Sequence, residues 1–254
     1  MIHIATVHWQ TNKWIDVQQE YFRKHIKSPY RIYGWFNDVT SFRSNAFHYM
    51  CFEPVREHAI KLNILGDIIC LSTTSESDIL IFIDGDAFPI ANLDSFLNEK
   101  LSTYKLAAIQ RRENNGDIQP HPCFCATTVG FWREIKGDWK SGHRWQDKNG
   151  SWISDVGGNL LKQLLDYKVD WYPLLRSNKH NLHAVLFGIY DSLIYHHGAG
   201  FRHAMTRFDR ARIKAKKPST VAQRATNIRE ANQIHSDEIF SKIEKGEDFL
   251  KNFV

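Results

Sequence analysis

The chain has 254 residues, 43% of them hydrophobic and 13% aromatic, which is enough for a packed core in one large domain or in one domain with a helical appendage, so we expect a folded chain. The formal charge of +5 is mild, and much of it lies in residues 202–217, so we expect no nucleic-acid partner bound over the whole surface. The four cysteines form no CxxC pair, the N-terminus has no apolar leader, and no run approaches the roughly 18 apolar residues of a membrane span. We therefore expect a cytoplasmic protein with reduced thiols.

The beginning of the chain predicts a strand, a helix and a second strand. Apolar residues favour a strand over 2–9, helical spacing follows over 14–26, and a second strand covers 30–36. The handedness rule for such units places the two strands side by side and parallel. Residues 41–54 are aromatic and irregular, and we predict no regular element for them.

A long helix over 55–71, opened by Pro54, then leads into the central strand of the chain. This strand is the apolar run 79–83, whose β-branched and aromatic content is typical of a strand buried on both faces. The sequence Asp84-Gly85-Asp86 follows directly at the carboxyl end of the strand, where ligands gather in open α/β sheets.

Two carboxylates one residue apart indicate a metal site. At a separation of a few Å they repel each other by about 4 kcal/mol at an effective dielectric constant of about 20. A divalent cation removes this repulsion, and hard oxygen ligands suit Mg²⁺ or Mn²⁺. The alternative is an ordinary Asp-Gly turn in which both acids are solvated.

The rest of the chain continues the alternation of strands and helices. We predict helices over 92–101, from Ser154 or Asp155 to Tyr167 and from about residue 226, a flexible loop over 136–149, and strands over 106–110, 123–129, 169–175 and 185–195. The order predicts an α/β fold with a mainly parallel, Rossmann-like sheet flanked by helices and a C-terminal helical extension.

Four stretches in this order carry a resemblance to a known family: 79–89, 121–132, 152–158 and 195–202. With them the chain resembles the nucleotide-sugar glycosyltransferases of the GT-A fold, whose hallmark is a DxD motif after an apolar strand, and it is family-2-like. The resemblance implies a catalytic domain over 1–204, with a nucleotide-sugar-binding half at 1–110 and an acceptor-binding half at 111–204, followed by a basic and helical extension at 205–254. It also implies transfer of a hexosyl or deoxyhexosyl group from a UDP-, GDP- or dTDP-sugar to a glycan or lipid-linked glycan, as in polysaccharide biosynthesis.

Carried over to this chain, the resemblance implies a metal-dependent site. Asp84 would face the ribose or donor sugar and the metal, and Asp86 would bind Mn²⁺ or Mg²⁺ on the donor diphosphate. His196 and His197 are the candidates for a further metal ligand. Adjacent residues on a strand point to opposite faces, so only one should reach the site, and we favour His196. The alternative is a strand end with exposed histidines.

Donor binding is expected at the ends of the first two strands and on the long helix. The candidate residues are Thr6, His8, Asn37, Asp38, Lys61, Asn63, Asp84, Gly85 and Arg202. Taken one at a time, the polar residues of the first two strands and of the long helix could equally be solvated surface positions. The stretch from His121 to Trp132 would shape the sugar and acceptor pocket, or else simply pack in the core.

Asp155 is the candidate general base. Close to a helix start, it could take the proton of the acceptor hydroxyl while that oxygen attacks the anomeric carbon, which would invert the configuration. The alternative is a helix N-cap without a chemical role. Inverting family-2 enzymes commonly carry a Glu-Asp pair here, whereas this chain has Asp155-Val156-Gly157.

The C-terminal part and the rival functions complete the predictions. The basic stretch 202–217 could lie on anionic lipid beside a lipid-linked acceptor, or be a solvated basic helix. The last helix could pack on the catalytic domain or pair two copies into a homodimer. The alternative functions are a nucleotidyltransferase or a haloacid-dehalogenase-type phosphatase using Asp84 and Asp86, or a non-catalytic carbohydrate- or membrane-binding module.

Overall fold

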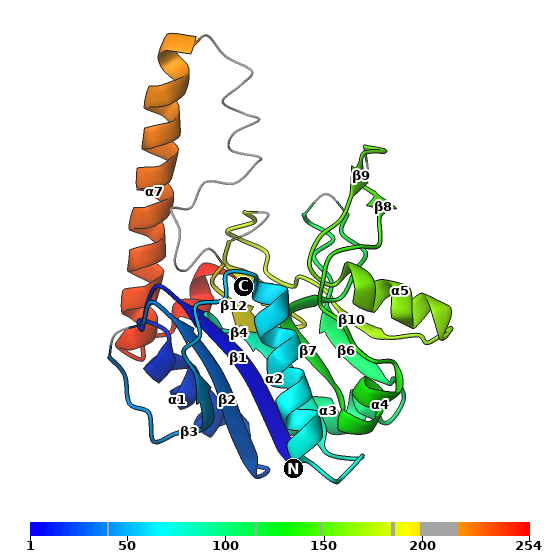
Figure 1. Ribbon diagram of the computed structural model, residues 1–254. Coiled ribbons are helices and arrows are strands. Elements are labelled where there is room, and N and C mark those ends of the chain that lie inside the picture. Colours follow the sequence, from blue (N-terminus) through cyan, green and yellow to red (C-terminus); the bar gives the residue numbers. More distant parts are fainter. Residues whose placement is uncertain (40, 115, 148, 184–185, 199–217) are drawn as a thin grey trace.

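The computed structural model describes residues 1–39, 41–114, 116–147, 149–183, 186–198 and 218–254. Its centre is a seven-stranded sheet in the order β10-β6-β7-β4-β1-β2-β3 (Figure 1). The strands are β1 (Ile2–Trp9), β2 (Tyr30–Asn37), β3 (Phe47–Cys51), β4 (Ile79–Asp84), β6 (Leu106–Ile109), β7 (His121–Thr128) and β10 (Tyr172–Leu174). Only β7 runs antiparallel to its neighbours in this sheet, so the predicted α/β class with a mainly parallel sheet is confirmed.

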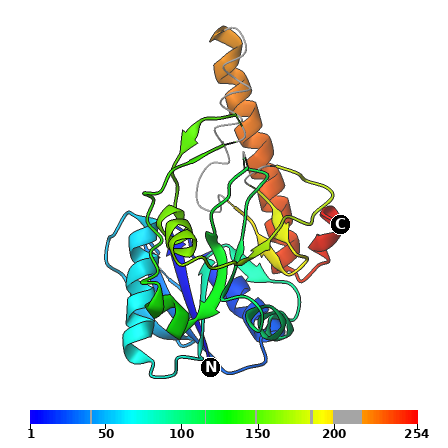
Figure 2. The same cartoon turned by 90° about the vertical axis from the view of Figure 1, so that its right-hand side faces the viewer.

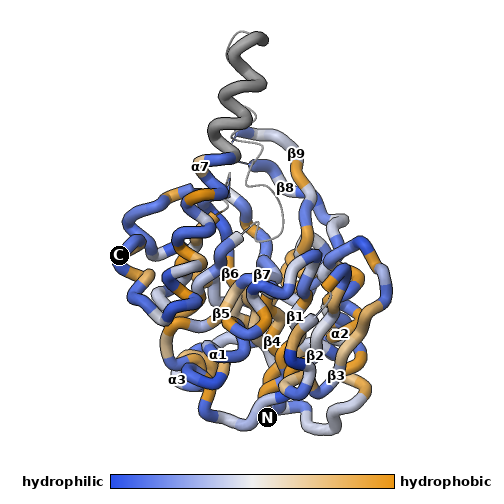
Figure 3. Tube along the Cα trace, turned by 90° about the vertical axis from the view of Figure 1, so that its left-hand side faces the viewer, coloured by the Kyte–Doolittle hydropathy of each residue, from blue (hydrophilic) through white to orange (hydrophobic). Residues whose placement is uncertain are grey.

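Helices cover both faces of the sheet, and the central strand β4 serves both cores. Leu80 and Phe82 pack on one side with α2, α4 and α5, while Ile81 and Ile83 pack on the other side with α1 and α3. The helices are α1 (Ile15–His25), α2 (His58–Ser72), α3 (Leu93–Leu101), α4 (Val129–Glu134) and α5 (Gly158–Asp166). Figure 3 shows the apolar residues gathered along these central strands. The strand is therefore buried on both faces, as its composition predicts.

Two small sheets shape the end of the central sheet where β1 and β4 finish. One has the order β11-β12-β5 and joins β5 (Ala87–Pro89) to the hairpin of β11 (Gly188–Tyr190) and β12 (Ile194–His196). The other is a hairpin of β8 (Trp145–Gln146) and β9 (Trp152–Ile153). The predicted single strand over 185–195 is thus two strands, and the predicted loop over 136–149 contains β8.

The segment before α2 differs from the prediction in two ways. A short edge strand, β3, lies within the stretch expected to be irregular, and α2 begins at His58 instead of next to Pro54. The carbonyl of Glu53 accepts hydrogen bonds from Trp35 Nε1 at 2.9 Å and from Asn37 Nδ2 at 2.7 Å. These bonds hold Glu53 against β2, and the first turn of α2 therefore begins only beyond Glu53, at His58.

The C-terminal helix packs on the domain. Helix α7 (Pro218–Glu244) and the 3₁₀ turn η1 (Phe249–Asn252) form a third core with α1, β5 and β12, through Ile239, Ile243, Phe249 and Phe253. The helix and the β8–β9 hairpin rise from the same end of the sheet (Figures 1 and 2). No helix of the described residues is long and apolar enough to cross a membrane. The boundary at residue 204 and pairing into a homodimer stay predictions, as does the cytoplasmic location.

Candidate metal and donor site

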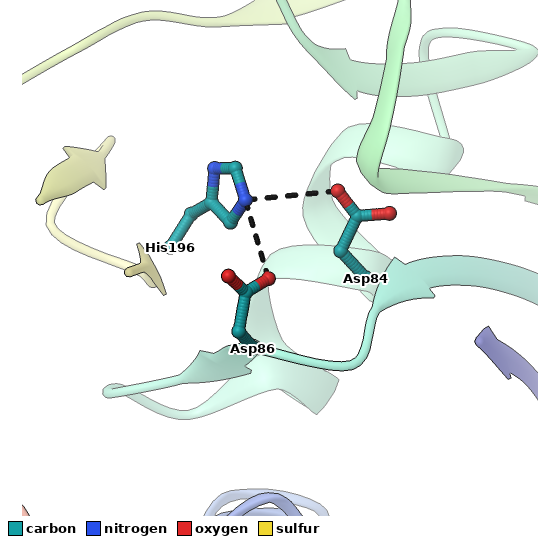
Figure 4. Close-up of side chains that lie close together, drawn as sticks. All are labelled: Asp84, Asp86 and His196. Atoms are coloured by element: carbon teal, nitrogen blue, oxygen red, sulfur yellow. Dashed lines mark ion pairs between the residues drawn. The ribbon is translucent and has the colours of Figure 1, made fainter. Parts of the chain in front are cut away.

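Three side chains from two distant segments meet at the end of β4. Asp84 is the last residue of β4, Asp86 lies just before β5, and His196 ends β12, paired opposite Ala87 of β5. His196 Nε2 lies 3.4 Å from Asp86 Oδ1 and 3.6 Å from Asp84 Oδ2 (Figure 4). One ligand atom from each residue falls within 4.8 Å of the others. Two carboxylate oxygens and one imidazole nitrogen at this spacing form a possible site for a divalent metal ion.

The turn that carries the two aspartates is pressed onto the end of β1. A Cβ atom at Gly85 would lie 2.6 Å from the carbonyl oxygen of Val7 and 2.6 Å from His8 Nδ1. Real Cβ atoms do not approach other atoms this closely, so only glycine fits at this position. The close contact fixes the direction in which both carboxylates leave the backbone.

A second support for this turn is a residue that sequence reasoning missed. Gln18 of α1 is buried, and its Nε2 donates hydrogen bonds to the carbonyl oxygens of Asp84 (2.8 Å) and Ala87 (2.7 Å). Thr6 donates to Gln18 Oε1 at 3.2 Å. Thr6 therefore supports, through Gln18, the turn Asp84-Gly85-Asp86, which is called the metal turn below. Thr6 is not among the residues that line the cavity described below.

The electrostatics of the three residues also fit a cation. Burial alone would lower the pKa of His196, but the Asp86 carboxylate and the Cys123 thiol beside its ring together outweigh burial, and the pKa is raised well above its ordinary value. Among the described residues, the buried Oδ1 atom of Asp84 has no hydrogen-bond partner, although His58 Nε2 lies 2.9 Å from it. The carboxylates thus favour positive charge close to them, as the raised pKa of His196 shows, and a divalent cation bound between them would supply more of it.

The neighbouring His197 faces the other way. Its Nδ1 lies 2.9 Å from the hydroxyl of Tyr195, and its Nε2 lies 2.6 Å from Ser236 Oγ on α7. Burial lowers the pKa of His197 to about 3, so the ring stays neutral. The structure brings His196 to the aspartates, while His197 ties β12 to the C-terminal helix.

A cavity of about 430 Å³ opens above the three residues. Two arginines and several histidines surround the acidic turn in its lining, and burial lowers the pKa of His121 well below its ordinary value. The charged and histidine lining residues, besides His8, are Arg56, His58, Arg111, His121, His196, Asp84, Asp86 and Asp155. Burial lowers the pKa of His8, which also lines the cavity, to about 4, and its ring stacks on Phe36. The volume lies in the ordinary range for small-molecule sites.

The predicted residues on α2 have different environments. Lys61 is fully buried, its Nζ lies 3.7 Å from the centroid of the Trp9 ring, and burial lowers its pKa to about 8 against an opposing attraction from Asp38. Asn63 instead bonds to Asp138 Oδ1 (2.6 Å) and to the Trp139 amide (2.9 Å), away from the cavity-lining residues.

At the end of β2, Asn37 Nδ2 donates a hydrogen bond to the carbonyl of Glu53, and its buried Oδ1 has no hydrogen-bond partner among the residues that the structure describes. Asp38 adopts a positive φ of 55° directly after the strand. Neither residue is among those that line the cavity, although Trp9, at the end of the adjacent strand β1, is. Arg202 and the basic stretch 202–217 lie outside the described residues.

Asp155 lines the same cavity with about half of its side chain exposed. Its Oδ1 accepts a hydrogen bond from the Val156 amide (2.8 Å), and its Oδ2 lies 3.6 Å from Arg111 Nη2. The N-cap of α5 is Gly157, at a φ of 89°, so Asp155 does not cap that helix. The carboxylate is held at the cavity wall by a buried guanidinium.

Several cavity residues were missed because no local motif marks them. Trp9 ends β1, and Arg111 lies two residues after β6, so the rule that ligands gather at strand ends is the signal that could have found them. His58 begins α2 and has no such signal, because its contact with Asp84 depends on how the helix docks.

Comparison with known proteins gives only distant matches. No protein-family model matches the sequence, and no curated protein matches it at a significant level. Among solved structures, the chain is similar to S. aureus TarS, with a TM-score of 0.39 and 10% identity over 55% of this chain and 30% of TarS. It is similar to the glycosyltransferase GlyE of Streptococcus pneumoniae TIGR4, with a TM-score of 0.39 and 10% identity over 68% of this chain and 44% of GlyE. It is also similar to the galactosyltransferase LgtC in complex with donor and acceptor sugar analogs, with a TM-score of 0.37 and 10% identity over 68% of this chain and 73% of LgtC. The matched part is less than half of TarS and of GlyE, and similarity at this level establishes neither a family nor an activity.

Proposed function

We propose that the chain is a metal-dependent glycosyltransferase of the GT-A type, which moves a sugar from a nucleotide-sugar donor to a hydroxyl of a glycan or lipid-linked glycan. The observation that carries the proposal is the group of Asp84, Asp86 and His196, at the carboxyl end of a buried strand and at one wall of a cavity whose lining also includes Arg56 and Arg111. An acidic turn among basic residues suits a metal-bound diphosphate, because the cation neutralises the carboxylates and the basic groups neutralise the phosphates.

The donor would lie between the metal turn and the ends of β1 and β2. Asp84, Asp86 and His196 would hold Mn²⁺ or Mg²⁺, which supplies a Lewis acid that neutralises charge on the departing diphosphate. Arg56 and Arg111 on the cavity wall would add positive charge toward the phosphates. The nucleoside would lie toward the Trp9 end of the cavity, near the ends of β1 and β2.

Asp155 is the residue proposed to take the proton. The acceptor oxygen forms its bond to the anomeric carbon as the bond from that carbon to the diphosphate oxygen breaks, and the electron pair leaves with the nucleoside diphosphate. The hydroxyl proton passes to Asp155 in the same displacement, which inverts the anomeric configuration. The contact with Arg111 fixes the carboxylate at the cavity wall for this role.

Metal-dependent nucleotide binding is the direct test. UDP, GDP, CMP, dTDP and their sugars are each added with Mn²⁺ or with EDTA, and the melting temperature is recorded. A ligand at 100 times its dissociation constant stabilises the folded state by about 2.7 kcal/mol, which is readily measured. We expect one nucleotide class to stabilise the protein only with Mn²⁺. Asp86→Ala should lose this effect, and Asp166→Ala, which changes an exposed aspartate of α5, should keep it.

The same samples separate the rival functions. Slow release of free sugar from a nucleotide-sugar supports a transferase, whereas release of pyrophosphate or inorganic phosphate would indicate a nucleotidyltransferase or a phosphatase. A metal-dependent shift that survives in Asp86→Ala would contradict the metal assignment. A protein that no nucleotide stabilises would be better described as a binding module.

A further inference from the structure

His58 contacts the metal turn from a side that the ligand group does not use. Its Nε2 lies 2.9 Å from Asp84 Oδ1, while the other oxygen of Asp84, Oδ2, lies 3.6 Å from His196 Nε2. The carboxylate of Asp84 is therefore held between two imidazoles, one on each oxygen. His58 is not a member of the compact group formed by Asp84, Asp86 and His196.

We propose that His58 is a positioning residue of the metal centre: it holds Oδ1 of Asp84 so that Oδ2 is presented to the metal beside His196 and Asp86. This inference rests on the proposed metal site. The two facing atoms, His58 Nε2 and Asp84 Oδ1, are both buried, and neither has a hydrogen-bond partner in the described part of the chain, so their approach to 2.9 Å is a polar contact without hydrogen-bond alignment.

The rest of α2 fixes the backbone that carries His58. The helix begins at His58, and Ala59, Leu62 and Leu65 bury its inner face against the sheet, so the start of the helix is held beside Asp84. The positive end of the helix dipole also lies on the side of Asp84, which favours the ionised carboxylate that a metal requires.

A carboxylate that ligates through one oxygen can rotate unless its other oxygen is held. Asp84 has its backbone fixed by Gln18 and by the close packing of Gly85, but these contacts do not act on its carboxylate group. His58 contacts the carboxylate itself, at Oδ1. Loss of such an outer partner typically weakens metal binding 10- to 100-fold, even though the ligands themselves are unchanged.

The test measures Mn²⁺ binding by electron paramagnetic resonance, with no donor or acceptor present. We expect His58→Ala to bind Mn²⁺ about 10- to 100-fold more weakly than the wild type, with the melting temperature in EDTA little changed because a third of the His58 side chain is exposed. His58→Gln places an amide N–H where Nε2 was and should recover most of the affinity. His48→Ala, which removes an exposed histidine of β3, should bind as the wild type does.

Spin-echo modulation from coordinated nitrogen separates positioning from direct ligation. One imidazole nitrogen on Mn²⁺ is expected in the wild type and in His58→Ala alike, and none in His196→Ala. Two nitrogens in the wild type and one in His58→Ala would make His58 a ligand and overturn the positioning role. Unchanged Mn²⁺ affinity in His58→Ala would overturn this inference alone, whereas a wild-type protein that binds no Mn²⁺ would overturn the proposed function with it.

Discussion

Lys61 holds a buried charge with little compensation, and removing that charge should stabilise the protein. Its side chain is fully buried, its Nζ has no hydrogen-bond partner in the part of the chain that the structure describes, and it contacts the face of the Trp9 ring at 3.7 Å. Burial lowers its pKa from 10.5 to about 8, which at about 1.4 kcal/mol per unit corresponds to a cost of about 3 kcal/mol for the charged form. Methionine has a similar shape and no charge, but it loses a cation–π contact that contributes about 0.5–2 kcal/mol. Lys61→Met should therefore stabilise the fold by about 2 kcal/mol at pH 7.

The pH dependence gives this prediction a second signature. Below pH 8 both the folded and the unfolded chain carry the proton on Lys61, so the whole cost of burial is present. Between pH 8 and about 10.5 the unfolded chain binds more protons than the folded one, so wild-type stability gains from this group as the pH rises. Methionine has no such dependence. The advantage of Lys61→Met should therefore be lost across this window.

Urea denaturation of both proteins at pH 7, 9 and 10.5 measures the difference, and other titrating groups cancel between them. Lys162→Met, which changes an exposed lysine of α5, is the control and should alter stability by less than about 0.5 kcal/mol. A less stable Lys61→Met at pH 7, or an advantage that stays constant to pH 10.5, would refute the reasoning. Lys61 does not line the cavity but contacts Trp9, which does, and a costly buried charge next to such a site is typical of a functional residue. Lys61→Met should therefore also bind the nucleotide about 10-fold more weakly.

Two further predictions concern the turn and the base. Gly85→Ala should lose about 1–3 kcal/mol of stability and most of its Mn²⁺ affinity, because the added Cβ would lie 2.6 Å from the carbonyl oxygen of Val7. The control is Gly246→Ala, whose Cβ would meet open space, so that it should lose stability only through its positive φ. Wild-type Mn²⁺ binding by Gly85→Ala would contradict this account. Asp155→Asn should keep metal-dependent nucleotide binding and lose about 10²-fold in the rate of sugar transfer, and normal turnover would remove it as the base.

The parts of the fold that could be predicted are those whose signal is local. The run Ile79–Ile83 is apolar throughout because both of its faces are buried, so its composition predicts a central strand without reference to other segments. The aspartates follow it directly, and the cap of α3 is equally local, since Asn92 Oδ1 accepts from the Ser95 amide. Each of these features needs no partner distant in sequence.

The hairpin of β11 and β12 could not be predicted, because its turn depends on a distant segment. Asp191 and Ser192 both adopt positive φ, near 51° and 52°, with no glycine to indicate a turn. The amide of Asp191 bonds to the Leu175 carbonyl, and the amide of Ser192 bonds to the hydroxyl of Ser177. Residues 175–177 thus stabilise a backbone conformation that the local sequence disfavours, and such a contact becomes visible only in the folded chain.

The position of His196 depends in turn on the C-terminal helix. Strand β12 is only three residues long, and its sheet partners are the short strands β5 and β11. On the face opposite the metal group, the ring of His197 lies 4.5 Å from that of Trp14 and bonds to Ser236 of α7, while Tyr195 packs against Phe249 and Phe253 of the chain end. The cavity lining that the structure describes includes no residue of α7, yet the helix holds the strand that presents the metal-site histidine. The C-terminal segment therefore stabilises the strand that carries His196. A substitution that weakens the packing of α7 on β12 should displace His196 and weaken metal binding at the proposed site.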